Sequence, residues 1–115
     1  MFSNLRDYYA PLLIGRDAMQ IEAALRAAGL LKAMANPVRL LVLCQLAEGE
    51  KSVGELERVA DVSQSALSQH LALLRHRGLV RGRREGQTIL YSLSGKEAPA
   101  LLAALYEVYC SKVRG

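Results

Sequence analysis

The stretch that decides the fold lies in the middle of the chain and reads Asp61-Val62-Ser63-Gln64-Ser65-Ala66-Leu67-Ser68-Gln69-His70-Leu71. It predicts a turn, a capping serine at Ser63 and a helix of about residues 63–77 that Gly78 ends. Helical spacing puts Leu67, Leu71 and Leu74 on one face and a second set on the opposite face: Ser65, Ser68, Gln69, Ala72 and His76.

The outer face of this helix is small, polar and uncharged until Arg75. A helix that enters the DNA major groove needs short side chains near its N-terminus and hydrogen-bonding groups for base edges. An ordinary amphipathic helix, which is the alternative, usually carries Lys and Glu on its solvent face. The pattern favours a recognition helix.

The flanking segments complete a known arrangement. Helices are expected at residues 16–34, at 37–47 behind an Asn36 cap, and at 52–59 behind a Ser52/Glu55 capping box. Strands at 79–84 and 88–93, joined around residues 85–87, precede a last helix at about 96–112. The predicted fold is therefore mainly α with a β-hairpin wing: a winged helix-turn-helix of five helices, dimeric, in residues 16–115, behind an N-terminal arm of residues 1–15.

The expected hairpin tip is basic, and five arginines fall between residues 75 and 84. Arginine at a wing can lie along phosphates or enter the minor groove, although a solvated basic hairpin is the alternative. The candidate contacts to double-stranded operator DNA are Ser63, Gln64, Ser65, Ser68, Gln69, His70, Arg75, Arg83, Arg84 and Gln87.

Composition sets further bounds. The chain has 115 residues, 51% of them hydrophobic, a formal net charge of +4 and a pI of about 9.3, which suits one domain and an anionic partner. No apolar run is long enough to span a bilayer and no secretion signal is visible, so we expect a cytoplasmic protein without a membrane partner. The first and the last predicted helix are each too apolar on one stripe for a small domain to cover alone, which favours symmetric pairing into a homodimer.

Three segments carry a family resemblance: residues 31–41, residues 47–50 and residues 63–71. They resemble the ArsR/SmtB family of bacterial repressors over about residues 20–113. The resemblance implies a homodimer built on the first and last helices, a palindromic operator, and release of DNA when an inducer is sensed.

The usual metal sites of that family are not visible. Residues 51–56 hold no cysteine, the last helix holds neither His nor Asp, and both histidines lie in the recognition helix. We therefore predict no metal site and no cofactor. A thiophilic ion held by Cys44 and Cys110 remains an alternative, as does a DNA-binding protein without a sensor.

The two cysteines fit a particular branch of the family. Alone, each could be a small buried apolar residue. The segment around Cys44, together with Cys110 near the end of the last helix, resembles the persulfide- and redox-responsive BigR/SqrR-like branch. The resemblance implies that the two thiols form a disulfide or polysulfide bridge in response to reactive sulfur species or oxidants.

Two other classes of protein fit the sequence less well. A thiol enzyme needs an acidified cysteine in a polar pocket, and the leucine-rich setting of Cys44 argues against one, so no enzyme and no catalytic residue is predicted. An architectural protein whose winged helix contacts another protein is disfavoured by the basic wing.

Overall fold

The computed structural model describes residues 18–110. The chain divides into two compact units, residues 1–31 and 32–115. In the first unit the described residues are those of α2 (Ala18–Met34) up to Leu31, and the predicted arm of residues 1–15 lies outside the described residues. The boundaries of the predicted domain stay a prediction.

Three short helices follow in the second unit: α3 (Pro37–Ala47), α4 (Val53–Ala60) and α5 (Gln64–His76). Each begins where the sequence supplies a cap. The Asn36 side chain accepts hydrogen bonds from the backbone N–H groups of Val38 and Arg39, at 3.0 and 3.1 Å. Ser52 and Glu55 form the predicted capping box, and Ser63 Oγ accepts from the backbone of Ala66. The predicted caps are confirmed.

The core lies between these helices and the sheet. Its side chains come from one face of each helix, as helical spacing predicts for Leu67, Leu71 and Leu74. The most completely buried large side chains are Leu43, Leu56, Leu67, Leu71, Leu74 and Val42. The recognition helix is therefore fixed to the core by its leucine face, which leaves the opposite face free.

The sheet has three strands among the described residues, in the order β1-β3-β2. The long pair, β2 (Val80–Glu85) and β3 (Thr88–Leu93), forms the predicted antiparallel hairpin, and Gly86 adopts the positive φ of 66° that its tight turn requires. The strand β1 (Lys51–Ser52) was not predicted. Its two residues are too few to show a period, and it is defined only by its pairing with Tyr91 and Leu90.

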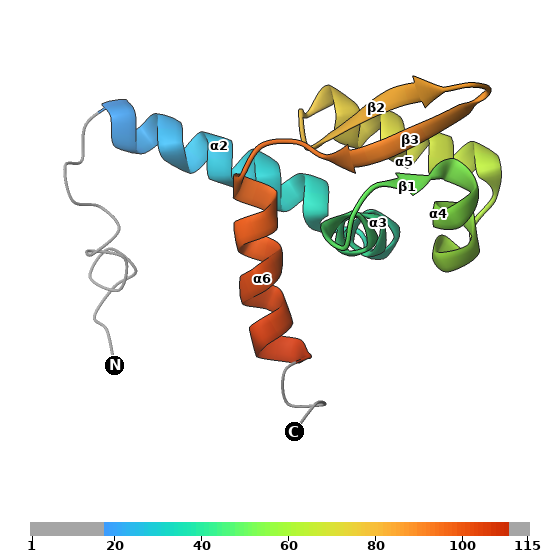
Figure 1. Ribbon diagram of the computed structural model, residues 1–115. Helices are drawn as coiled ribbons and strands as arrows, with labels where there is room; N and C mark the ends of the chain where they lie inside the picture. Colours follow the sequence, from blue (N-terminus) through green and yellow to red (C-terminus); the bar gives the residue numbers. More distant parts are fainter. Residues whose placement is uncertain (1–17, 111–115) are drawn as a thin grey trace. The chain divides into compact units, whose positions relative to one another are not determined.

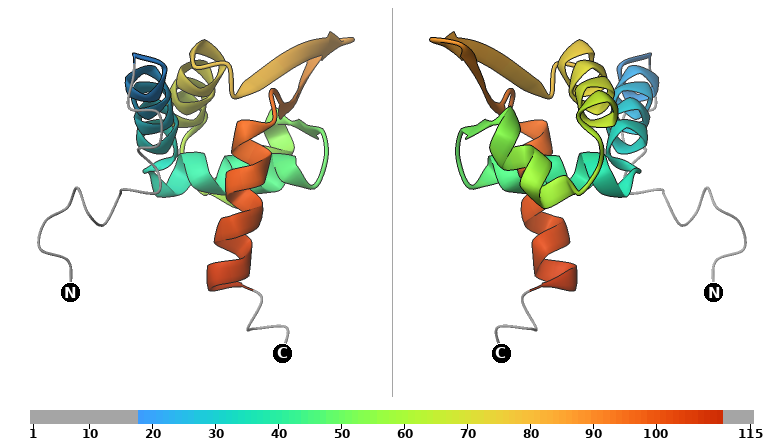
Figure 2. Two further views of the ribbon diagram at one scale, coloured as in Figure 1. Left: turned by 90° about the vertical axis from the view of Figure 1, so that its left-hand side faces the viewer. Right: turned by 90° about the vertical axis from the view of Figure 1, so that its right-hand side faces the viewer.

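The last helix, α6 (Glu97–Tyr109), packs against α3. Figures 1 and 2 show the β2–β3 hairpin on one side of α3 and α6 extending away on the other. The five described helices and the hairpin give the predicted winged helix-turn-helix. Among the described residues no single helix is long and apolar enough to cross a membrane; α2 and α3 pass that test only when counted together.

Candidate nucleic-acid interface and thiol pair

The outer face of α5 is exposed, as the sequence predicts. Ser65, Ser68 and Gln69 are all solvent-exposed, whereas the leucines on the opposite face are buried. Hydroxyl and amide groups at these positions can donate and accept hydrogen bonds, which is what base edges in the major groove offer.

Ser63 and His70, both predicted DNA contacts, are engaged within the protein. Ser63 caps α5, and half-buried His70 lies with its Nδ1 3.3 Å from Arg39 Nη1. Because a guanidinium can only donate, His70 Nδ1 must accept, and the ring proton is therefore assigned to Nε2. Arg39 also donates from Nε to the backbone oxygen of Ala33 at 2.6 Å and from Nη2 to that of Lys32 at 3.4 Å.

Arg39 thus joins the end of α2, the start of α3 and the recognition helix. Sequence reasoning did not give it a role. The residue stands in the family-like segment of residues 31–41, but its partners, 31 positions apart in the case of His70, become neighbours only in the fold.

Arg75 joins the recognition helix to the wing. Its Nη1 donates to the hydroxyl of buried Tyr91 at 3.2 Å. Directly beside this contact, Gly82 lies so close to the Tyr91 ring that a Cβ atom there would be 3.1 Å from Tyr91 Cε1 and from Ile89 Cγ2. The absence of a side chain at Gly82 allows the ring to pack across β2.

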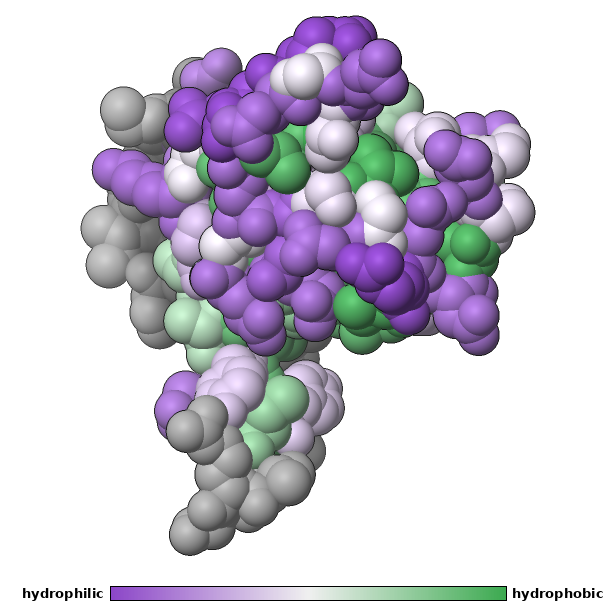
Figure 3. Space-filling model, turned by 45° about the vertical axis from the view of Figure 1, so that its right-hand side comes forward, coloured by the Kyte–Doolittle hydropathy of each residue, from purple (hydrophilic) through white to green (hydrophobic). Residues whose placement is uncertain are grey.

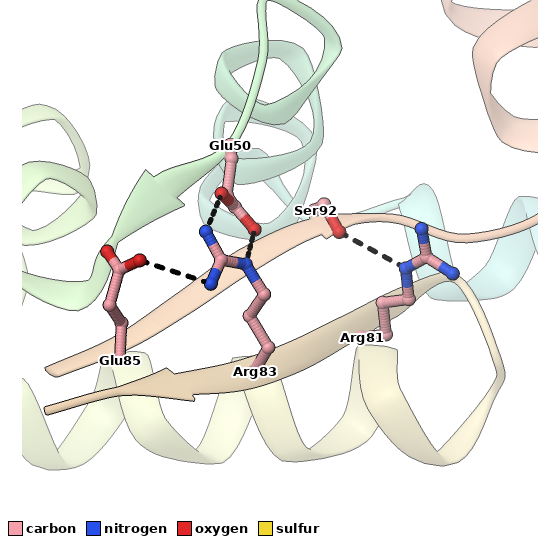
Figure 4. Close-up of polar contacts among 5 residues, drawn as sticks. All are labelled: Glu50, Arg81, Arg83, Glu85 and Ser92. Atoms are coloured by element: carbon pink, nitrogen blue, oxygen red, sulfur yellow. Dashed lines mark hydrogen bonds and ion pairs between the residues drawn. The ribbon is translucent and has the colours of Figure 1, made fainter.

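The wing arginines differ in their surroundings. Arg83 makes a bidentate ion pair with Glu50, with Nε to Oε2 at 2.8 Å and Nη2 to Oε1 at 2.9 Å, and its Nη1 reaches Glu85 at 3.3 Å (Figure 4). The hydrogen bond from Arg83 lowers the pKa of Glu50, and the two carboxylates raise the pKa of Arg83. Arg81 donates to Ser92 Oγ at 3.4 Å.

Arg84 and Gln87 are exposed, and within the described residues the Arg84 guanidinium makes no ion pair. On the face shown in Figure 3, hydrophilic residues dominate the upper part, whereas α6, at the bottom, mixes pale and hydrophobic residues. The fold brings the polar face of α5 and the basic wing to neighbouring positions of one unit, since α5 packs against β2.

The two cysteines lie on elements that pack together. Cys44 is in α3, Cys110 directly follows α6, and both are free and exposed. Partial burial raises the pKa of the Cys44 thiol, and the negative charges of the Cys110 thiolate and of Glu48 raise it further. In the single chain neither thiol is a buried core residue, which was the alternative left open by the sequence.

The described residues contain no group of three or more His, Cys, Asp and Glu side chains that could hold a metal ion. A site for a thiophilic ion would therefore rest on the two cysteines and on ligands from elsewhere.

Comparison with known proteins agrees with this geometry. Residues 36–81 match the family model described as "Bacterial regulatory protein, arsR family". The chain is 46% identical over 104 residues to the biofilm growth-associated repressor of Agrobacterium fabrum, with 88% of each chain covered. The chain belongs to the ArsR family.

Among solved structures, this ArsR-family protein is similar to HlyU and BigR. The structure of reduced HlyU from Vibrio cholerae superimposes with a TM-score of 0.77 and 49% identity, over 81% of this chain and 98% of that one. The repressor BigR from Xylella fastidiosa gives 0.74 and 44%, over 78% and 92%. The protein is thus a BigR/HlyU-like, DNA-binding transcriptional regulator, and its family is one of regulators and not of enzymes.

Proposed function

We propose that this regulator is a cytoplasmic homodimeric repressor that binds a palindromic operator and leaves it when Cys44 and Cys110 become bridged. The inducer in this proposal is a reactive sulfur species or another oxidant. The observation that carries the proposal is the thiol pair: two exposed cysteines on packed elements, with the charge of one acting on the pKa of the other.

The proposed operator contacts are Ser65, Ser68 and Gln69 in the groove, with Gln64 at the helix start and Arg84 and Gln87 of the wing. Their exposure on one unit supports this assignment. Three further candidates are proposed to act at the same interface in part by positioning α5. Ser63 caps the helix, His70 contacts Arg39, and Arg75 is bonded to Tyr91 of the wing. Arg83, the remaining candidate, is paired with Glu50 and Glu85.

The proposed dimer would use α2 and α6. Both helices expose large apolar side chains in the single chain: Ile21 and Leu25 on α2 are 65% and 69% exposed, and Val108 and Tyr109 on α6 are 61% and 74% exposed. Apolar surface of this kind is stabilised by burial against a partner, and a second copy related by a two-fold axis is the commonest partner.

A persulfide can form the proposed bridge in two steps. One cysteine thiolate attacks the outer sulfur of a persulfide RSSH, which forms a protein persulfide and releases RSH. The second thiolate then attacks the inner sulfur of that persulfide and expels HS⁻, so that a disulfide remains. If both cysteines are first persulfidated, attack of one on the inner sulfur of the other expels HS⁻ and leaves a trisulfide.

A peroxide gives the same end point by another route. The thiolate takes one oxygen from the peroxide and becomes a sulfenic acid, and the second thiol displaces water to form the disulfide. A direct disulfide requires Cα atoms within about 7 Å, whereas an additional sulfur atom lengthens the bridge. The product therefore reports the distance between the resting thiols.

The bridge would act by favouring one geometry of α6 on α3. A covalent link made in only one state shifts the equilibrium by its differential stability, and about 3 kcal/mol corresponds to a change of more than a hundredfold in operator affinity. That is sufficient for induction.

Intact-mass and peptide mass spectrometry of the treated protein test the bridge. Treatment with glutathione persulfide should join the Cys44 and Cys110 peptides in one species, with a mass that shows whether sulfur is retained. Detection of the two peptides only as separate modified species would contradict the proposal. Release of DNA by a thiophilic ion under reducing conditions, without any bridge, would support the metal-sensing alternative.

A further inference from the structure

Neighbouring arginines of the wing face opposite sides of the sheet. Successive residues of a strand alternate between the two faces, so Arg83 and Arg84 point away from each other. Figure 4 shows Arg81, Arg83 and Glu85 on one side of the hairpin, together with Ser92 and Glu50. The other face carries Gly82 and Arg84 with their partners Tyr91 and Ile89, and Tyr91 is bonded to Arg75 of the recognition helix.

The face with Arg84 borders a hollow of about 220 Å³ at the junction of wing and helix. The residues that line it are Arg75, Gly82, Arg83, Arg84, Ile89 and Tyr91. Arg75 comes from the last turn of α5, and Arg83 and Arg84 come from the wing, so three arginines border one open concavity. The guanidinium of Arg83 is paired with Glu50, which leaves Arg75 and Arg84 as the lining cations without an ion pair among the described residues. A DNA phosphate has the charge and the size that such a position would accept.

On the opposite face the charge of Arg83 is paired within the protein, whereas Arg81 makes a hydrogen bond to the neutral Ser92 hydroxyl. Glu50 immediately precedes β1. The strand β1 pairs with one edge of β3, and β2 pairs with the other edge. The Glu50 carboxylate reaches over β3 to hold Arg83 through two parallel hydrogen bonds of 2.8 and 2.9 Å. The contact therefore spans all three strands and links the turn after α3 to the wing.

We propose that Glu50 is a positioning and specificity-determining residue for DNA binding: it neutralises Arg83, holds the wing on the three-stranded sheet, and leaves Arg84 with Arg75 as the phosphate-binding cations of the junction. The inference rests on DNA binding by this regulator but not on the thiol switch. Without Glu50, Arg83 would keep only its ion pair with exposed Glu85 on a less constrained wing, and its charge would be more available to phosphates of any sequence.

The chain offers a matched control. Glu48 lies in the same turn and carries the same charge, but its ion pair, 3.6 Å long, is with Lys51 and not with the wing. Glu48→Gln and Glu50→Gln change the net charge equally, so a difference between them cannot come from net charge alone.

The test measures binding of the reduced full-length protein to two 30-bp duplexes by fluorescence anisotropy over a range of salt concentrations. One duplex has a randomised sequence, and the other is enriched from that pool by repeated selection with the wild-type protein. Each neutralised phosphate contributes about 0.9 to the slope of log K against log salt. Circular dichroism confirms that each variant is folded.

We expect Glu50→Gln to bind the random duplex several times more tightly than wild type, with a salt slope steeper by about 1 to 2 per dimer and a smaller ratio of selected to random affinity. Glu48→Gln should have the wild-type ratio. Arg83→Ala should keep the wild-type slope, whereas Arg84→Ala should flatten it by about 2 per dimer.

The same affinity ratio and salt slope in Glu48→Gln and Glu50→Gln would overturn the inference. An equal loss of salt slope in Arg83→Ala and Arg84→Ala would also overturn it, because Arg83 would then be a phosphate contact. If wild type enriches no duplex at all, the proposed operator function fails as well. Enrichment by wild type with no effect of Glu50→Gln removes only the role of Glu50.

Discussion

Replacing Gly82 by alanine should destabilise the protein, although removal of a strand glycine usually does the reverse. Loss of backbone freedom in the unfolded chain contributes about 0.4–1 kcal/mol of stability when glycine becomes alanine. At Gly82 the new Cβ would be 3.1 Å from both Tyr91 Cε1 and Ile89 Cγ2. Tyr91 is 5% exposed and its hydroxyl is bonded to Arg75, so the ring has little freedom to move.

The cost of overpacking at this site is larger than that gain. Overpacking of a closely packed site costs about 1–3 kcal/mol, and displacement of the ring also weakens the hydrogen bond from Arg75. The net expectation is a loss of about 1 kcal/mol. Since 1 kcal/mol corresponds to about 4–8 °C in domains of about 60–100 residues and to about 2–4 °C in those of about 150–250, the melting temperature should fall by a few degrees.

Thermal unfolding at a fixed protein concentration measures the change, with Gly54→Ala as the matched control. Gly54 lies in α4, where the nearest atom to an added Cβ is Ser52 Oγ at 3.9 Å, so alanine there should stabilise by about 0.5–1 kcal/mol. A rise in melting temperature for Gly82→Ala would refute the reasoning that the Tyr91 ring and the wing are fixed by contact at this glycine.

Three further outcomes are expected. Gln69→Ala should cost about 1–3 kcal/mol at the selected duplex and relax its sequence preference, as affinities for single-base variants of that duplex will show; undiminished discrimination would remove Gln69 from the readout. Val108→Glu should give monomers in analytical ultracentrifugation, since this side chain is 61% exposed in the single chain and would be buried in the dimer. The control Val59→Glu on α4, where the side chain is 40% exposed, should leave the wild-type oligomer. Wild type sedimenting as a monomer at micromolar concentration would contradict the dimer. Because the Cys110 thiolate raises the pKa of Cys44, the rate of Cys44 alkylation should reach its midpoint at a lower pH in Cys110→Ser than in wild type, and an unchanged midpoint would mean that the two thiols do not interact.

The sequence predicted the fold well because its local signals agree with its packing. The caps at Asn36, Ser52 and Ser63 mark helix starts that the structure contains within a residue of the expected positions. The leucine spacing of α5 predicted its buried face, and Gly86 predicted the hairpin turn. These features depend on neighbours in sequence, where periodicity is informative.

Contacts between distant segments could not be predicted in the same way. No local pattern announces that Arg83 pairs with Glu50, 33 positions away, or that Arg39 lies beside His70. From sequence, Arg83 and Arg84 were equivalent candidates for phosphate binding. The alternation of β2 and the position of β1 make Arg83 and Arg84 different, and both facts require the fold.

The thiol pair could be predicted from the sequence only in part. The resemblance drew attention to Cys44 and Cys110, but only the packing of α6 on α3 explains how residues so far apart in sequence can interact. The exposure of Cys44 in the single chain follows from its position outside the buried face of α3, which is formed by Val42, Leu43 and Leu46.

A gel shift of wild type and Cys44→Ser on the selected duplex, with and without glutathione persulfide, tests the central proposal most directly. Both proteins should bind equally when reduced, because a serine at an exposed position of α3 leaves the helix-turn-helix core unchanged. Persulfide should release wild type from the duplex and leave Cys44→Ser bound. Release of Cys44→Ser to the same extent as wild type would show that a bridge between Cys44 and Cys110 is not the switch.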